Sequence, residues 1–524
     1  MHLTIWNWLL AVLPIAVILV LMVSFKWGGS KAGAAGWFTA IAIAVLFFGA
    51  NMKLLAFAQI KSLLLALDVM YIIWMALLLF HVADEAGAVK VIGQSLPRLT
   101  ADRVMQGLLL GWVFASFLQG MGGFGVPVAI VAPLLVGLGF SPVQSVIMAS
   151  VGHGWAVNFG SLATSFQSLL AVTGLPGELL APAAAVLLGI ASFGCGILVA
   201  YVGAGWKGLW HSLPAVFILG SSMSVVQYLL VTNGMWTLGA TGAGLTGLIV
   251  SVLITRLPLY HGNIVGSDGK TESANGQPSL FISISAYLFL IVLTFLTKLV
   301  PAVEDFLGQV QIALKFPEIT TALGWVTPAE VGREINIFGH PGAVLLYTSL
   351  IAYFVYARSG YYKPGAPTRI LQKMGRSAVK SSLGILAMVG MALMMSHSGM
   401  TYILAQGLSK SFGQTLYPVV APFIGALGAF ITGSNNNANV LFGVLQMNTA
   451  QLLGLSTTLV LAAQTAGGSL GSIMAPAKVI VGCSTVGLND REGEVIGRML
   501  IYGVLLLLLM AVVTTVLVLS GSTL

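Results

Sequence analysis

The chain has 524 residues, of which 57% are hydrophobic and only 7% are charged. Soluble domains carry about 25% charged residues, so this composition excludes a soluble protein and predicts an all-α polytopic membrane protein. The net charge of +8 does not indicate nucleic-acid binding, because the largest basic block lies between two apolar segments. We therefore expect a lipid bilayer, and no nucleic acid, as the partner of this chain.

Apolar segments long enough to cross a bilayer, which takes about 20 residues, recur along the chain. In chain order, clear examples are residues 5–24, 62–81, 184–204, 213–232, 236–255, 280–300, 381–406 and 499–520. With shorter and interrupted segments added, the sequence predicts about 12–14 membrane elements. The first segment has no basic residue before it and no clear cleavage site, so we interpret it as a retained helix rather than a signal peptide.

Two interruptions of hydrophobic segments occupy similar places in the two halves of the chain. Residues 120–127 contain four glycines and a proline, and residues 433–439 contain a run of asparagines. Inside a membrane, backbone that is not helical is tolerated only where protein or a water-filled cavity covers it. Matched interruptions in two halves are therefore the best sequence indication of a transporter binding site.

Each interruption begins a longer unit, and the two units share further landmarks. Gly152 follows Gly139 by 13 residues, and Gly467 follows Gly454 by the same interval. The pattern of each unit predicts a re-entrant helical hairpin followed by a discontinuous helix. The second glycine break lies at residues 152–154 in the first unit and at residues 467–469 in the second. We expect two repeats, inverted relative to each other as in other carriers. A chance coincidence among 63 glycines is the alternative.

A polar connector separates the two units. We expect an N-terminal membrane half at residues 1–255, the connector at residues 256–279 and a C-terminal membrane half at residues 280–524. Six basic residues without an acid lie between positions 358 and 380 and indicate a cytoplasmic loop.

The sequence lacks the motifs that metal binding and ATP-driven transport require. The two isolated cysteines and the seven histidines show no metal-ligand spacing, and no Walker phosphate loop is present. The sequence therefore predicts no cofactor, no metal and no ATP-driven transport. A secondary active carrier is the leading interpretation, a channel is a weaker one, and a membrane-embedded enzyme, which needs convergent acids, bases or ligands, is a remote alternative.

Motifs in both units, and between them, carry a resemblance to a known family. They lie at residues 117–120, 125–130, 134–140, 206–208, 210–215, 432–434, 438–442, 445–446 and 465–468. Here the chain resembles the lactate permease family, whose members carry 2-hydroxymonocarboxylates across prokaryotic plasma membranes.

The resemblance implies an elevator-like carrier, in which a substrate-binding unit moves against a scaffold, often as a homodimer. It implies L-lactate or a related small anion such as glycolate as substrate, with H⁺ as the coupling ion. A sodium-coupled carrier or exchanger for another small organic anion is the alternative.

The chain departs from the family at charged positions. Familiar members have Glu where this chain has Gln119 and Asp where it has Asn435. Around the position of His153 they have an uncharged polar stretch. Where this chain has Ala-Pro-Ala followed by Lys478, they often have Ser-Pro-Gln. Two carboxylates are therefore missing and two candidate cations are gained.

The candidate substrate site combines backbone and side-chain groups. Broken helices present free N–H groups and the positive ends of helix dipoles to an anion, and glycine lets the backbone approach it. The candidate substrate-binding residues are Gly122, Gly123, Gly125, Ser434, Asn435, Asn436, Gly467, Gly468, Ser469 and Lys478. Close helix packing is the alternative for the glycines. Three interpretations are open for Lys478. It pairs with the substrate carboxylate, it occupies the position of a coupling cation, or its amino group reaches the membrane interface.

Three further residues are candidates for proton coupling. His153 lies between two glycines and, like His397, carries an imidazole that titrates near physiological pH. Asp68 is the acid most clearly inside an apolar segment and either carries a proton or pairs near a helix end. A structural role is the alternative for both histidines.

Overall fold

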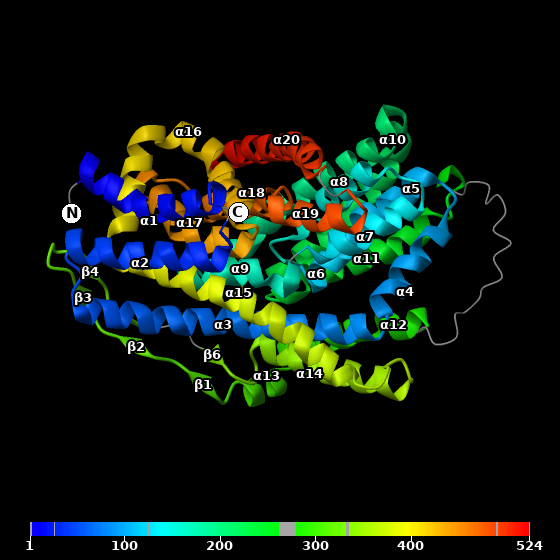
Figure 1. The fold of residues 1–524 in the computed structure, drawn as a ribbon, viewed down its shortest axis with the longest axis horizontal. Helices are drawn as coiled ribbons and strands as arrows, with labels where there is room; N and C mark the ends of the chain where they lie inside the picture. Colours follow the sequence, from blue (N-terminus) through cyan, green and yellow to red (C-terminus); the bar gives the residue numbers. More distant parts are fainter. Residues whose placement is uncertain are drawn as a thin grey trace.

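A computed structural model describes residues 3–25, 27–123, 125–260, 279–331, 335–488 and 491–522. The described chain is almost entirely helical (Figure 1), as the composition predicts. The N-terminal half contains α1 (Ile5–Val23), α2 (Gly29–Phe47), α3 (Met52–Glu85), α4 (Ala88–Ser95), α5 (Arg103–Leu108), α6 (Ala115–Met121), α7 (Val126–Gly137), α8 (Pro142–Gly152), α9 (Gly160–Thr173), α10 (Gly177–Thr232) and α11 (Gly239–Ile254). Short helical turns are η1 (Leu96–Leu99), η3 (Gly154–Ala156), η4 (Trp236–Leu238) and η5 (Pro258–Tyr260), and η2 (Leu109–Phe114) is a π-helical segment.

The C-terminal half is also helical, apart from one short extended arm. Its helices are α12 (Leu280–Leu299), α13 (Pro301–Leu307), α14 (Pro341–Arg358), α15 (Ala366–His397), α16 (Met400–Thr432), α17 (Asn435–Leu453), α18 (Thr457–Ile473), α19 (Pro476–Thr485) and α20 (Glu492–Leu519). The arm pairs β1 (Gln311–Ile312) with β6 (Ile335–Asn336), β2 (Lys315–Phe316) with β5 (Glu330–Val331), and β3 (Ile319–Thr320) with β4 (Val326–Thr327), all antiparallel.

The membrane assignment rests on helix length and composition. Within the described residues, 11 helical segments are long and apolar enough to cross a bilayer, and α7 is a shorter apolar helix. One expected span, residues 381–406, is wrong as a single helix, because α15 ends at His397 and α16 begins at Met400. Gly399 between them takes a φ of +84°, a left-handed conformation that ends helices and that glycine adopts without strain.

The two units share a turn that the sequence landmarks anticipated. Gly139 and Gly454 both adopt left-handed φ angles, +88° and +64°. Two residues later, the side chains of Ser141 and Ser456 accept hydrogen bonds from the first turns of α8 and α18. A left-handed glycine stops one helix and a serine N-cap starts the next, so this local sequence produces the same turn twice.

Both hairpin interruptions lie where the sequence places them. In the first unit α6 ends at Met121 and α7 begins at Val126; Phe124 is outside the described residues. In the second unit α16 ends at Thr432 and α17 begins at Asn435, after Gly433 with a φ of +71°.

The discontinuous helix of the first unit contains an unusual backbone turn. After α8 ends at Gly152, the chain runs through η3 to α9, where Ser161, Leu162 and Ala163 have φ angles of 47°, 58° and 64°. Residues with a side chain rarely adopt this left-handed conformation, and successive ones are held there only by surrounding structure. Such strained turns cluster at functional sites.

The expected glycine break at residues 467–469 is wrong. α18 runs without interruption through these residues to Ile473, and the break falls at Met474–Ala475, before Pro476 starts α19. Gly467 instead allows close packing, because a Cβ there would collide with the Pro422 carbonyl oxygen of α16. A Cβ on Gly468 would collide with Asn435 Oδ1.

Replacing Gly467 by alanine should therefore destabilise the protein. The added methyl group meets backbone rather than a movable side chain, and such overpacking typically costs about 1–3 kcal/mol. Gly497→Ala is the matched control, because nothing lies within 4 Å of a Cβ added to Gly497 in α20. Thermal unfolding in detergent should show a lower midpoint for Gly467→Ala alone; equal midpoints for both variants would contradict this packing role.

The two sequence halves pack against each other throughout the molecule. α3 contacts α14 and α15, α1 contacts α16, and α17 contacts α9. In Figure 1, α15 crosses the view beside the long α3, although the two helices are far apart in sequence. The connector expected at residues 256–279 falls mostly on residues 261–278, outside the described residues. The proposed domain boundaries stay a prediction.

Candidate functional site

A cavity of about 430 Å³ brings the two hairpin interruptions together. Its lining comes from α2, α3, the first interruption, α15, the second interruption and the start of α19. The lining residues are Gly29, Ser30, Leu77, Phe80, His81, Gly122, Val126, Ser377, Gly384, Ile385, Thr432, Gly433, Ser434, Asn436, Asn437, Ala477, Lys478 and Val481. Segments more than 300 residues apart in sequence thus form one site.

Three helices begin at this cavity. Val126 is the first residue of α7, Ser434 precedes α17, and Ala477 lies in the first turn of α19; all three residues line the cavity. The first turn of a helix has N–H groups without helical partners and carries the positive end of the helix dipole. Each such end stabilises an anion by about 0.3–1 kcal/mol, so their convergence favours a negatively charged ligand.

Lys478 adds an amino group that can carry a positive charge to the same cavity. It is the one lysine or arginine among the described lining residues, and it is 9% exposed. Its Nζ donates a hydrogen bond to Ser472 Oγ at 3.2 Å, and no described carboxylate lies within ion-pair distance. A buried cation without an anionic partner is costly, so an anionic ligand would supply what the protein lacks.

The asparagine run connects the two units behind the cavity. Asn436 Oδ1, on the cavity wall, accepts a hydrogen bond from Ser165 of α9 at 2.5 Å. Asn435 points into α18 instead, where its Nδ2 donates to Thr465 Oγ1 and Ser469 Oγ, both at 3.1 Å. Asn439 Nδ2 donates to the Ser165 carbonyl oxygen at 3.0 Å. This network holds α17 against both discontinuous helices.

The structure divides the sequence-derived substrate candidates into two groups. Gly122, Ser434, Asn436 and Lys478 line the cavity. The others do not line it: Gly123, Gly125, Asn435, Gly467, Gly468 and Ser469. A Cβ on Gly123 would collide with Ser161 Oγ, so this glycine packs the first interruption against the left-handed turn. These six residues belong to the packing around the cavity and do not form its wall.

The coupling candidates do not gather in this cavity. His153 is fully buried, and its Nδ1 donates to the Ala149 carbonyl oxygen at 2.7 Å, which makes Nε2 the basic nitrogen. Nε2 has no hydrogen-bond partner in the described part of the chain. His397 lies at the end of α15, where its Nδ1 is 3.3 Å from Thr327 Oγ1 of the extended arm. Neither histidine lines the cavity.

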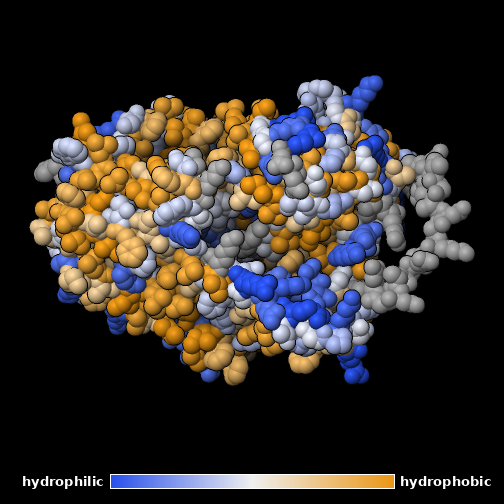
Figure 2. All heavy atoms as spheres, viewed as in Figure 1, coloured by the Kyte–Doolittle hydropathy of each residue, from blue (hydrophilic) through white to orange (hydrophobic). Residues whose placement is uncertain are grey.

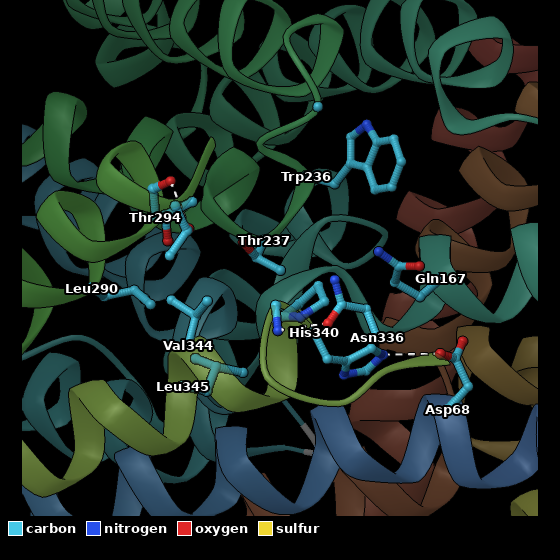
Figure 3. A pocket seen from close by; sticks show the side chains of 14 residues that line it. Asp68, Gln167, Trp236, Thr237, Leu290, Thr294, Asn336, His340, Val344 and Leu345 are labelled. Carbon is cyan, nitrogen blue, oxygen red and sulfur yellow. Dashed lines mark hydrogen bonds and ion pairs between the residues drawn. The ribbon is translucent and has the colours of Figure 1, made fainter. Parts of the chain in front are cut away.

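Asp68 lies in a second, smaller cavity (Figure 3). This cavity of about 220 Å³ is bounded by α3, α9, η4, α12 and the start of α14. Asp68 is 1% exposed and accepts a hydrogen bond from His340 Nε2 at 2.9 Å. His340 Nδ1 accepts from the Gly342 N–H and so caps α14, and the ring stacks on Tyr71. Asp68 therefore pairs in the middle of α3, not near a helix end.

Sequence reasoning missed His340 and His81. His340 precedes Pro341 at the start of α14, which is a signal for a helix N-cap but not for a partner 272 residues away. His81 lines the larger cavity, and as the last residue of the apolar segment 62–81 it carries no sequence signal for a site.

Exposed basic residues lie at the end of α14 and in the part of α15 that leads to the larger cavity. Hydrophobic residues cover most of the left part of the face in Figure 2, and hydrophilic residues gather around the end of α14 and the start of α15. Exposed basic residues there are Arg358, Lys363, Lys373 and Arg376. Arg376 is followed directly by Ser377, which lines the cavity. Lys373 is paired with Glu85 of α3, and the other basic residues raise the local concentration of anions.

Comparison with known proteins agrees with an anion-handling membrane protein. The model of the L-lactate permease family matches residues 7–520. The L-lactate permease of Bacillus subtilis is 27% identical over 97% of this chain and 95% of its own length. The glycolate permease GlcA of Escherichia coli is 27% identical over 93% of this chain and 91% of its own length.

Among solved structures, the YdaH transporter of Alcanivorax borkumensis overlaps 86% of this chain and 85% of its own, with a TM-score of 0.48 and 17% identity. The family match spans nearly the whole sequence, and its members are transporters rather than enzymes. The chain therefore belongs to the L-lactate permease family and is a multi-pass transport protein of the prokaryotic plasma membrane.

Proposed function

We propose that this protein carries L-lactate and related small 2-hydroxymonocarboxylates, such as glycolate, across the plasma membrane. The observation that carries the proposal is the cavity in which Lys478 meets the starts of α7, α17 and α19. Lys478 binds the carboxylate, and the N–H groups at the start of α17 complete its hydrogen bonds. The names of the relatives supply the substrate class, because lactate and glycolate share a carboxylate and a neighbouring hydroxyl group.

Uptake of labelled L-lactate into proteoliposomes tests this proposal. We expect unlabelled glycolate to inhibit uptake more strongly than malate or succinate. The reason is that Lys478 is the one lysine or arginine among the described lining residues, so a second carboxylate would be desolvated without a partner. Stronger inhibition by the dicarboxylates would rule out this specificity, and no saturable lactate uptake would rule out the function.

We propose H⁺ as the coupling ion, with His153 as its carrier and Asp68 as the second candidate. His153 belongs to the discontinuous helix of the first unit, and its basic Nε2 is buried without a described partner. Gln119 and Asn435 cannot titrate, so the proton needs another group. An elevator-like movement and a homodimer, which the resemblance implies, stay predictions.

Sodium coupling is the second candidate, and the asparagine network favours it. Asn435 Oδ1 and Asn439 Oδ1 are buried and accept no hydrogen bond from the described residues. Uncharged oxygens beside broken helices are ligands for Na⁺ in other carriers. Replacing Na⁺ by choline on both sides of the membrane should leave uptake unchanged if the proton drives it, and should abolish uptake if Na⁺ does.

A further inference from the structure

Lys478 is the proton-binding side chain that a molecule in the larger cavity can reach. Among the described lining residues, His81 and Lys478 are the basic side chains and none is an acid. Both ring nitrogens of His81 are inaccessible to solvent, whereas Lys478 is 9% exposed. The serine, threonine and asparagine side chains on the wall do not titrate in the physiological range. A proton that binds in this cavity together with a substrate therefore binds at Lys478.

The contacts of Lys478 do not fix its charge. Its Nζ donates to Ser472 Oγ at 3.2 Å, and that hydroxyl donates its own hydrogen to the Ser469 carbonyl oxygen at 2.9 Å. Ser472 therefore accepts from Lys478 whether the amine is neutral or protonated. An ammonium group keeps two more hydrogens for the cavity, and a neutral amine keeps one hydrogen and a lone pair. The protein by itself accommodates both forms.

The acids on the helices around Lys478 are paired with other bases. The described ion pairs there are Glu85–Arg369, Glu85–Lys373, Asp84–Lys373, Glu494–Arg491 and Glu494–Arg498. The helices α7, α17 and α18 carry no ionisable side chain. Other titratable side chains beside the lining residues, or on α19 and the helices that contact it, include Lys31, His81, His153, Arg376, Cys483 and Glu492. Within the described part of the chain, none of them forms an ion pair with Lys478.

A buried amine with one neutral partner responds to the arrival of an anion. Desolvation disfavours an unpaired buried ion, and such a group loses its charge instead. A carboxylate beside the amine favours the charged form, because opposite charges attract strongly where water is excluded. Binding of a proton and binding of a carboxylate at one amine therefore strengthen each other, and this reciprocity is required by thermodynamic linkage.

We propose that Lys478 takes up one proton with each substrate anion and releases both on the other side of the membrane. The proposal rests on the proposed function and adds to His153 a proton-binding group in the substrate site itself. When lactate enters, the neutral amine takes a proton from water in the cavity, and the ammonium group pairs with the carboxylate. When lactate leaves, the proton returns to water. The amine and its ligand then carry no net charge in either state, so neither form moves a buried charge through the membrane.

Replacement of Lys478 by arginine separates a permanent charge from one that comes and goes. The guanidinium group stays protonated and still has donors for a carboxylate and for Ser472. We expect Lys478→Arg to exchange labelled for unlabelled L-lactate in proteoliposomes, because exchange never requires the empty site to cross. Net uptake driven by a pH gradient should fall about ten-fold or more, because the empty site now keeps a buried charge. Lys207→Arg, at an exposed position of α10 outside both cavities, is the matched control and should do both.

The pH dependence of substrate affinity is the second measurement. Half-saturation of lactate exchange is measured between about pH 6 and pH 9, with equal pH on both sides of the membrane. Lactate stays ionised in this range, so affinity should fall as the pH rises and the amine loses its proton. At the alkaline end the fall should approach about ten-fold per pH unit. Lys478→Arg should remove this dependence, and His153→Gln should retain it, because His153 does not line the cavity.

The outcomes distinguish this inference from the proposed function. Full pH-driven accumulation in Lys478→Arg, or a flat affinity profile in the unmodified protein, would show that the coupled proton binds elsewhere. If Lys478→Arg neither exchanges nor accumulates lactate, the profiles of the unmodified protein and of His153→Gln decide, since a slope lost in His153→Gln assigns the proton to that residue. If the unmodified protein transports neither lactate nor glycolate, the proposed function itself is wrong. If it transports lactate and a pH gradient has no effect, the inference fails while lactate transport stands.

Discussion

Replacement of Lys478 by methionine should nearly abolish lactate transport without destabilising the protein. Methionine has a similar length and no charge, so the substrate carboxylate loses its cationic partner in a buried site. Removing one partner of a buried charge pair costs about 2 kcal/mol or more, which corresponds to about a 30-fold loss of apparent affinity. We expect this loss in the concentration dependence of labelled lactate uptake into proteoliposomes.

Thermal stability separates this effect from misfolding. In the free protein Lys478 makes one side-chain hydrogen bond, to Ser472 Oγ, and Ser472 also donates to the Ser469 carbonyl oxygen. The methionine variant therefore loses little and removes a buried charge, so its unfolding midpoint should be unchanged or higher. Lys207→Met, at an exposed position of α10, is the matched control and should transport normally. Normal lactate affinity in Lys478→Met would exclude Lys478 from the substrate site.

Replacement of His153 by glutamine should abolish lactate accumulation driven by a pH gradient while sparing exchange. Exchange of labelled for unlabelled substrate needs binding and movement but no net proton flow. Glutamine can still donate to the Ala149 carbonyl oxygen, which His153 Nδ1 contacts at 2.7 Å, but it cannot be protonated. Accumulation under an imposed pH gradient and counterflow at equal pH are measured on the same proteoliposome preparation.

The same assay decides between the coupling candidates. Unchanged accumulation in His153→Gln would remove this residue from the mechanism, and Asp68→Asn then tests the second candidate. Asp68 is already bonded to His340, so its loss without effect on coupling would assign the pair a structural role. If both variants behave normally and a Na⁺ gradient drives uptake, proton coupling is wrong, and the oxygens of the asparagine network become the expected sodium ligands.

Features that depend on composition and on local conformation can be predicted from the amino-acid sequence alone. Low charge and long apolar segments fix the membrane class. Left-handed glycines at 139, 433 and 454, with serine caps at 141 and 456, fix where helices stop and start. These signals act over a few residues, because a φ angle or a capping hydrogen bond needs no distant partner. Lys478 stood out for the same reason, as a charge in an apolar segment.

Which residues come into contact depends on the tertiary fold. Gly122 and Lys478, more than 300 positions apart, share a cavity with His81, and Asp68 is paired with His340. The same glycine pattern marks a break at Gly152 and a packing contact at Gly467, where α18 lies against the Pro422 carbonyl oxygen. A glycine permits both a turn and a close approach, and the choice depends on the helix that packs against it. The neighbouring helix is another segment of the chain, so the residues next to a glycine do not show which of the two roles it has.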